Sequence, residues 1–496
     1  MSLLERLESM KKTSAKQKSS ASGSSASSAE VTPRDNLKSR VQEKLIAELD
    51  ASILAQPDPD IKKTLLRARI EENIAMLGSD IGVSLTKREH EEIIQELLDD
   101  ILGLGAIQPL LENEDISEIM VNGPDQVYIE LNGRLTLADV TFKDEEQVRS
   151  VINKIISPLG RRCDESMPYV DARLKDGSRV NAVIPPLALN GSTITIRKFK
   201  ADPLRIEDLI KFGALNRLMA DYMKASVMVA KNIVVSGGTG SGKTTLLNAL
   251  SSFIDPSARI CTIEDAAEIQ ILQPHWVRLE TKAPNVEGKG AVTMRDLIRN
   301  TLRMRPDRVI VGECRGGETL DMLQAMNTGH DGSLTTLHAN NPEGAMRRVE
   351  TMVLMSGVDL PTRAIRETMG SAIHMIIQAS RLADGSRRIT YITQSLGFDG
   401  DVVQMADIFR YIQTGIDDDG MIIGSHQPVK HIPTFYAQYI KSGIIMPITI
   451  FGFTKEESQE WLKENLEDDL RRSPDLLEKL SEEDAPIDFS NARAGH

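Results

Sequence analysis

Cysteine is scarce in this chain, and its spacing excludes two common uses of the residue. The 496 residues contain three cysteines, Cys163, Cys261 and Cys314, which lie far apart in the sequence. An odd number at wide spacing forms neither a disulfide framework nor a CxxC metal pair. The sequence therefore predicts a protein of the reducing cytoplasm without a cysteine-bound zinc module.

Long hydrophobic runs are missing as well. A membrane-spanning helix needs about 20 consecutive apolar residues, and the best candidate here, residues 443–453, has about half that length and contains Pro447. The N-terminus becomes polar after Leu4, so no signal peptide is expected either. These absences favour a cytoplasmic protein with no membrane anchor of its own.

An excess of basic charge is also absent. The formal net charge is −13, and residues 455–484 carry 12 acidic and 5 basic side chains, which accounts for −7 of it. A general nucleic-acid binder carries a basic excess instead. We therefore expect no nucleic acid as a partner.

The composition of the chain changes along its length and predicts several domains. Residues 1–34 form a Ser/Lys-rich tail that cannot bury a core and should be disordered. Leu3, Leu4, Leu7 and Met10 nevertheless fall at helical spacing, as in a docking helix or a frayed terminus. Helical spacing of apolar residues predicts a three-helix bundle over 35–103, and short strand patterns predict an α+β domain over 104–202. Residues 203–453 alternate strand and helix as in an α/β domain, and 454–496 form an acidic helical or disordered tail.

A complete phosphate-binding loop follows a short apolar strand at residues 231–245, which read KNIVVSGGTGSGKTT. In such a loop, backbone N–H groups surround an anion, the lysine neutralises outer phosphates and the threonine hydroxyl reaches Mg²⁺. The alternative, a glycine-rich turn that binds nothing, does not explain the strand–loop–helix order. The predicted nucleotide-binding residues are Gly237, Gly238, Thr239, Gly240, Ser241, Gly242, Lys243, Thr244 and Thr245, with Thr244 also a metal ligand.

Two further apolar strands end in carboxylates. The segment TIEDAAE places Glu264, Asp265 and Glu268 after one strand, and Gly312-Glu313 follows the strand expected at 309–311. In a parallel sheet these strand ends face the ligand crevice. Glu313 fits the Walker B position that holds Mg²⁺, although it could also cap a strand end, and Glu268 is equally compatible with a solvated loop.

Two histidines flank the strand expected at 334–337. His338 follows that strand, where a residue that faces the nucleotide would be found, whereas His330 also fits a core position. Neither histidine has other metal-ligating residues near it in the sequence, so a zinc site is not expected.

Taken together, these four segments resemble the Walker A, Asp box, Walker B and His box of the secretion ATPase superfamily. These ATPases are the motors of type II secretion, type IV pili and type IV secretion. The resemblance covers residues 105–453. Residues 164–181 (DESMPYVDARLKDGSRVN) and 321–332 (DMLQAMNTGHDG) look like the CpaF/TadA branch, the tight-adherence (Flp) pilus motor. Many pilus-extension and type II motors carry a tetracysteine zinc module, and its absence here favours the CpaF or type IV secretion branch.

The resemblance implies a fold and roles for named residues. The fold would be a RecA-like P-loop motor domain (α/β) preceded by a small α+β domain and an N-terminal helical bundle. Glu264 would orient or deprotonate the attacking water, Glu313 would hold Mg²⁺, and His338 would sense the γ-phosphate. Arg173, Arg179 and Arg197, from the preceding domain, would reach phosphates across a domain or subunit boundary as arginine fingers. Each arginine could instead form a structural ion pair with Asp164, Glu165 or Asp171.

The function implied by the resemblance is an ATP-hydrolysing homo-hexameric motor with ATP and Mg²⁺ as ligands. It would power assembly of a Tad/Flp type IV pilus, its retraction or both, through inner-membrane platform proteins that hold it at the membrane periphery. The nearest alternative is a type IV secretion ATPase that moves protein or DNA. A ring helicase, which the acidic charge disfavours, and a nucleotide-gated scaffold that hydrolyses little are further alternatives.

Overall fold

The computed structural model describes residues 32–48, 53, 56–82, 85–131, 133–199, 203–282, 284, 289–399, 402–466, 474–483 and 485–492. The chain divides into two compact units, Met1–Ala201 and Asp202–His496. Nearly all of the tail expected at 1–34, including its N-terminal apolar residues, lies outside the described residues.

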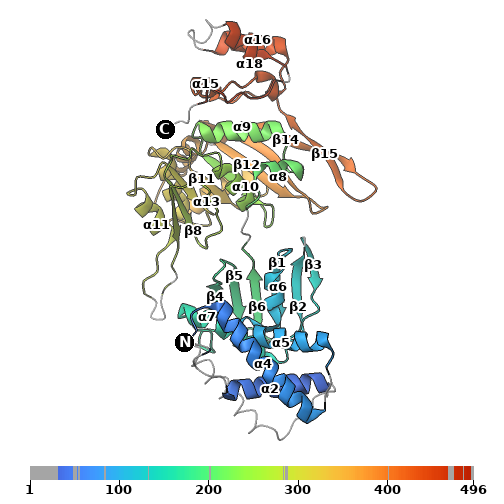
Figure 1. Ribbon diagram of the computed structural model, residues 1–496. Coiled ribbons are helices and arrows are strands. Elements are labelled where there is room, and N and C mark those ends of the chain that lie inside the picture. The colour runs from blue at the N-terminus through green and yellow to red at the C-terminus, as the bar shows by residue number, and fades with distance from the viewer. Residues whose placement is uncertain are drawn as a thin grey trace. The chain divides into compact units, whose positions relative to one another are not determined.

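Among its described residues, the first unit contains the helices α2 (Pro33–Glu48), α4 (Pro59–Ile81) and α5 (Lys87–Leu102), which lie together in blue in Figure 1. The Asp58 side chain caps α4, and Thr86 and Glu89 form a capping box at the start of α5. Their apolar stripes meet in one core that contains Leu37, Leu66 and Ile93. The apolar residues that repeat at helical spacing thus pack against one another between helices that follow one another in the sequence.

A six-stranded antiparallel sheet completes the first unit, in the order β3-β2-β1-β6-β5-β4. Its strands are β1 (Ile116–Asn122), β2 (Val127–Leu131), β3 (Arg134–Leu137), β4 (Tyr169–Arg173), β5 (Arg179–Val183) and β6 (Thr193–Arg197). Short helices η1 (Gly105–Ile107) and α6 (Gln108–Glu112) precede the sheet, and α7 (Glu145–Ile156) with η2 (Ser157–Leu159) lies between β3 and β4. Val148 and Ile152 of α7 share a core with Ile119 and Ile194 of the sheet. The helical bundle is attached to this α+β part, because Lys154 donates hydrogen bonds to the carbonyl oxygens of Asp100 and Gly103.

The second unit is built on a nine-stranded sheet in the order β15-β14-β13-β12-β7-β11-β10-β8-β9. Its parallel part comprises β7 (Ile233–Gly237), β8 (Ile260–Glu264), β9 (Trp276–Glu280), β10 (Arg308–Val311), β11 (Leu334–Leu337) and β12 (Met375–Arg381). The strands β13 (Arg387–Asp399), β14 (Val402–Ile416) and β15 (Ile422–Pro428) extend it as an antiparallel meander. The residues of β7, β8, β10 and β11 are all buried, as expected for parallel strands covered on both faces.

Helices cover both faces of this sheet (Figure 1). They are α8 (Ile206–Lys211), α9 (Arg217–Met228), α10 (Lys243–Ser251), α11 (Met294–Thr301), α12 (Glu318–Asn327), α13 (Pro342–Leu354) and α14 (Thr362–Ala372). Alternate residues of β7 belong to different cores: Val235 packs with α9 and α10, whereas Val234 packs with α11 to α14. Successive side chains of a strand point to opposite faces of the sheet, so Val235 faces the helices on one side and Val234 those on the other.

The segment expected as an acidic tail contributes to the core of the second unit. It follows α15 (Tyr436–Lys441) and η3 (Ile448–Phe451), and it contains α16 (Lys455–Asn465) and α18 (Pro474–Ser481). Leu462 and Leu480 are buried in the same cluster as Tyr436 and Phe451. The acidic side chains therefore lie on the outer face of amphipathic helices, and residues 467–473, 484 and 493–496 lie outside the described part.

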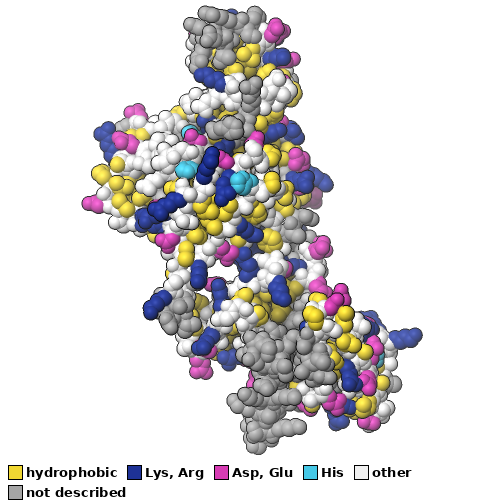
Figure 2. Space-filling view, turned by 60° about the vertical axis from the view of Figure 1, so that its left-hand side comes forward, with side chains coloured by type: hydrophobic (Ala, Val, Ile, Leu, Met, Phe, Trp, Pro, Cys, Tyr) yellow, Lys and Arg dark blue, Asp and Glu magenta, His cyan; other side chains and the backbone are white. Residues whose placement is uncertain are grey.

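The fold class expected from the sequence is confirmed: an α/β RecA-like P-loop domain follows a small α+β domain and a helical bundle. Within the described ranges, no helix combines the length and the hydropathy that crossing a membrane requires. On the face shown in Figure 2, acidic and basic side chains are interspersed.

Candidate nucleotide site

The phosphate loop connects the central strand β7 to α10. Because β7 lies between β11 and β12 in the sheet, its carboxyl end is fixed on both sides. Gly240 and Gly242 have φ values of +69° and +94°, which L side chains rarely adopt. A Cβ on Gly237 would overlap the carbonyl oxygen of Ala379 and the hydroxyl of Ser241. These three glycines are therefore required by backbone conformation or by close approach.

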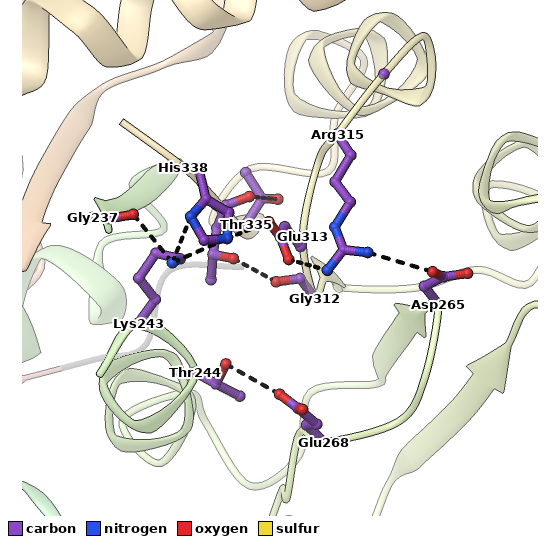
Figure 3. Close-up of polar contacts among 12 residues, drawn as sticks. Gly237, Lys243, Thr244, Asp265, Glu268, Gly312, Glu313, Arg315, Thr335 and His338 are labelled. Carbon is purple, nitrogen blue, oxygen red and sulfur yellow. Dashed lines mark hydrogen bonds and ion pairs between the residues drawn. The ribbon is translucent and has the colours of Figure 1, made fainter. Parts of the chain in front are cut away.

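Lys243, the first residue of α10, lies against the loop that precedes it. Its side chain is buried, and Nζ donates to the carbonyl oxygens of Gly237 at 3.1 Å and of Gly238 at 3.0 Å. The same ammonium group lies 3.5 Å from both ring nitrogens of His338. Figure 3 shows this arrangement, which concentrates positive charge where a phosphate would bind.

Glu313 connects the histidine to an arginine. His338 Nε2 lies 2.9 Å from Glu313 Oε1, and Arg315 Nη2 lies 2.7 Å from Glu313 Oε2 (Figure 3). Arg315 Nη1 reaches Asp265 Oδ2 at 3.6 Å. Burial and the nearby Lys243 lower the pKa of His338, while Glu313 acts in the opposite direction. The structure thus brings together Glu313, His338 and Lys243, which sequence reasoning had placed on three separate strand ends.

Glu264, at the end of β8, is buried, and its expected role in activating water stays a prediction. Its side chain is 3% exposed, and Oε1 accepts hydrogen bonds from the backbone N–H groups of Glu268 at 2.6 Å and Ile269 at 2.8 Å. Burial raises the pKa of Glu264, and these backbone bonds oppose the rise. A Cβ on Gly312 would lie 2.9 Å from Glu264 Cγ, so this glycine makes room for the buried glutamate. The buried carboxylate of Glu264 therefore stabilises the turn at 264–269 through these two backbone hydrogen bonds.

Glu268, rather than Glu264, extends toward the phosphate loop. The Thr244 hydroxyl donates to Glu268 Oε2 at 3.4 Å, as Figure 3 shows. The sequence left Glu268 open between the site and a solvated loop, because the motif does not reveal which of its acids the turn directs inward. Arg315 was also missed, and its position two residues after Glu313 was the only signal for it.

The three arginines expected to act as fingers lie side by side on the first unit. Arg173 of β4 pairs in register with Arg179 of β5, which pairs with Arg197 of β6. Arg197 Nε also lies 3.3 Å from Glu118 Oε1 on β1. Arg197 thus forms an ion pair with Glu118, an acid that was not among those considered. The reach of the three arginines to a phosphate stays a prediction.

Comparison with known proteins identifies the family. Residues 100–395 match the profile of the family described as type II/IV secretion system protein, which is more than half of the chain. The chain belongs to that secretion family.

Several relatives are similar to this secretion-family chain over its central part. A putative conjugal transfer protein of Mycobacterium tuberculosis is 35% identical over 332 residues, which cover 66% of this chain and 93% of that protein. Conjugal transfer protein TrbB of Rhizobium radiobacter is 32% identical over 304 residues, covering 60% and 90%. Type IV secretion system protein PtlH of Bordetella pertussis is 33% identical over 327 residues, covering 58% and 91%.

Solved structures are similar as well. The VirB11 ATPase of the Brucella suis type IV secretion system is 29% identical, with a TM-score of 0.32 over 58% of this chain and 94% of that one. The pilus retraction motor PilT with bound ADP is 21% identical, with a TM-score of 0.41 over 55% and 77%.

The oxygen-rich side chains around the loop of this secretion-family protein fit Mg²⁺. Among the described residues, no group of three or more His, Cys, Asp or Glu is arranged to hold a metal by itself. Mg²⁺ at a phosphate loop does not need such a group, since one or two protein oxygens and the substrate phosphates suffice. The Thr244 hydroxyl and the carboxylates of Glu268 and Glu313 supply that chemistry.

Proposed function

We propose that this protein binds ATP with Mg²⁺ and hydrolyses it to ADP and phosphate at the carboxyl edge of the second sheet. The observation that carries the proposal is the convergence of Lys243, Thr244, Glu268, Glu313 and His338 on one phosphate loop. Each of the four strand ends, those of β7, β8, β10 and β11, contributes at least one polar or charged group. A merely structural loop would not require an ammonium, a hydroxyl, an imidazole and two carboxylates together.

The residues divide the work of hydrolysis as follows. The loop N–H groups and Lys243 bind the phosphates. Thr244 and Glu313 would hold Mg²⁺, which would supply positive charge to the phosphate oxygens. His338, whose lowered pKa favours a neutral ring, is positioned to respond to the outermost phosphate. Glu268 orients the attacking water, and Glu264 acts as a positioning residue through the backbone of Glu268. The contact between Thr244 and Glu268 supports this division over the original assignment of Glu264 as the base.

Two glutamine substitutions test the assignment. We expect E268Q to lower kcat by about 10²–10³-fold while ATP still binds, because it removes the carboxylate that orients water. E264Q keeps an oxygen that can accept the two backbone N–H groups, so it should retain most of the turnover. ATP hydrolysis and equilibrium nucleotide binding are measured for both variants, with K243A as the control that loses binding.

The opposite pattern, with turnover lost in E264Q and kept in E268Q, would restore Glu264 as the base. Absence of ATP binding by the wild-type protein would contradict the proposed function itself.

The next question is which pilus or secretion system this ATPase powers. We propose a homo-hexamer that drives assembly of a Tad/Flp pilus, its retraction or both, through an inner-membrane platform, on the strength of the residues at 164–181 and 321–332. The named relatives favour a second candidate, a type IV secretion ATPase that moves protein or DNA, because they include conjugal transfer and type IV secretion proteins. Deletion of the gene separates the two: loss of surface fibres supports the pilus motor, and loss of substrate transfer with normal fibres supports the secretion ATPase.

A further inference from the structure

The hairpin formed by β12 and β13 ends beside the phosphate loop. Strand β12 runs parallel to β7, and their pairing continues to Ala379 and Gly237, where the loop begins. Immediately beyond this pair, β12 ends at Arg381 and β13 starts at Arg387. The sheet topology therefore places two arginines next to the phosphate loop. Both lie outside the four nucleotide-binding motifs of the sequence.

Both arginines approach the tip of the loop. Arg387 Nε donates a hydrogen bond of 2.8 Å to the carbonyl oxygen of Gly240. A Cβ on Gly240 would lie 3.8 Å from Arg381 Nη1, and one on Gly242 would lie 3.6 Å from Arg387 Cδ. Both side chains are exposed, and within the described part of the chain neither guanidinium is paired with a carboxylate. Their positive charge is thus not neutralised by a neighbouring acid.

The turn between the two arginines is itself fixed. Asp384 Oδ1 accepts hydrogen bonds from the backbone N–H of Ser386 at 2.8 Å and from its hydroxyl at 2.7 Å. Asp384 Oδ2 accepts the backbone N–H of Ile422 on β15 at 2.9 Å. The turn is therefore stabilised by bonds to Ser386 within it and to Ile422 on β15. These bonds fix the start of β13 and so orient Arg387 before any ligand binds.

We propose that the β12–β13 hairpin is a wall of the nucleotide site, in which Arg387 is a positioning residue for the phosphate loop and Arg381 adds charge beside the phosphates. A loop rich in glycine loses much conformational entropy when it is ordered around an anion. The bond from Arg387 to Gly240 restrains the loop tip in advance and so lowers that cost. Arg381, without a carboxylate partner, attracts the phosphates through its charge. This inference rests on the proposed function, because it concerns the same nucleotide.

Substitution of Arg387 tests the positioning role. We expect R387A to weaken the binding of both Mg·ATP and Mg·ADP by about tenfold, which corresponds to about 1.4 kcal/mol, while kcat falls much less. Both nucleotides should be affected alike because Arg387 contacts the loop and not the terminal phosphate. R387K should restore part of the affinity, since it keeps a charged donor. Dissociation constants are measured by fluorescence titration, together with kcat and KM, and the melting temperature shows whether each variant is folded.

Arg388 provides the matched control, because its guanidinium donates to the carbonyl oxygens of Phe212 at 3.2 Å and Arg387 at 3.0 Å and not to the loop. R388A should bind nucleotide like the wild type. Wild-type affinity in R387A, or an equal loss in R388A, would overturn the positioning role.

Arg381 is tested by the dependence of binding on salt. R381A should lose about threefold in affinity at low ionic strength and less at high salt, because screening weakens a charge that makes no fixed contact. An R381A affinity equal to that of the wild type at low salt would remove Arg381 from the wall. If the wild-type protein binds nucleotide and both arginine variants do so equally well, this inference fails while the proposed function stands.

Discussion

His374 is a half-buried histidine whose ring accepts a hydrogen bond in its neutral form. Its Nδ1 accepts the backbone N–H of Asn232 at 3.0 Å. Burial and the nearby ammonium of Lys231 lower its pKa to about 4, although Asp331 acts in the opposite direction. In the unfolded chain this imidazole takes up a proton near pH 6.5, whereas in the folded protein it does so only at a lower pH.

This difference predicts a loss of stability in mild acid. Because the folded-state pKa is depressed, the stabilisation is complete above pH 6.5 and declines as the pH falls toward 4. Between pH 7.5 and pH 5 the free energy of unfolding should fall by about 2 kcal/mol on account of this residue. In H374N the amide oxygen can replace Nδ1 without titrating, so that part of the pH dependence should disappear from urea denaturation curves. An unchanged pH dependence in H374N would show that other groups are responsible.

Single residues of the site differ in how far the sequence could predict them. Lys243 and Thr244 were predicted because the motif fixes their positions by chain connectivity alone. Glu264 and Glu268 belong to one segment, and only the path of the turn at 264–269 decides which carboxylate faces Thr244. The contact of Arg387 with Gly240 joins residues 147 positions apart, which no local pattern encodes.

At the level of elements, Asn232 lies at the start of β7 and connects it to two helices and to the strand β11. It is fully buried, and its Oδ1 accepts the backbone N–H groups of Gly332 at 2.9 Å and Ser333 at 3.0 Å. Its Nδ2 donates to the carbonyl oxygens of Met326 at 3.2 Å and Ala372 at 2.9 Å. One side chain thus satisfies backbone groups at the ends of α12 and α14 and at the start of β11.

Loss of this side chain should destabilise the second unit. We expect N232A to lower the free energy of unfolding by about 2–4 kcal/mol, because it leaves several buried backbone groups without partners. N232D has nearly the same shape but directs an acceptor at two carbonyl oxygens, so it should be at least as harmful. N327A is the control, since exposed Asn327 donates one bond to Thr368, and it should cost less than about 1 kcal/mol. Chemical denaturation measures all three, and equal stability of N232A and N327A would contradict the connecting role.

Elements with strong local patterns were predicted well, whereas elements that depend on distant partners were not. The strands expected at 309–311 and 334–337 agree with β10 and β11 to within one residue, and the apolar strand expected before the phosphate loop corresponds to β7. The edge strand β9 was missed, because its residues alternate only weakly between buried and exposed. The packing of α16 and α18 was also missed, since charge dominates their sequences. Among the described residues of the segment, the apolar residues buried in the core are Leu462, Leu466, Leu480 and Ile487.

At the scale of the whole molecule, three arginines of the first unit are expected to act on a nucleotide that the second unit binds. Arg173, Arg179 and Arg197 occupy paired positions on adjacent strands, which places three guanidinium groups on neighbouring strands of one sheet. Like charges on paired positions repel one another, and Glu118 on β1 offsets part of this repulsion at Arg197. The sequence could predict the arginines as candidates, but assembly of the units and of subunits depends on surfaces that no single-chain pattern describes.

A charge swap at Arg197 distinguishes a catalytic role from a structural one. Arg197 pairs with Glu118 across β1 and β6, so R197E alone breaks an ion pair and also removes a possible phosphate contact. We expect R197E to reduce kcat by about 10²-fold or more while ATP still binds, as for loss of an arginine finger. The double variant E118R/R197E restores the ion pair but leaves a carboxylate at position 197. If Arg197 reaches a phosphate, the swap recovers the melting temperature of the wild type without recovering turnover. Recovery of turnover in the double variant would instead assign Arg197 to the first sheet alone, and the search for the finger would move to Arg173 and Arg179.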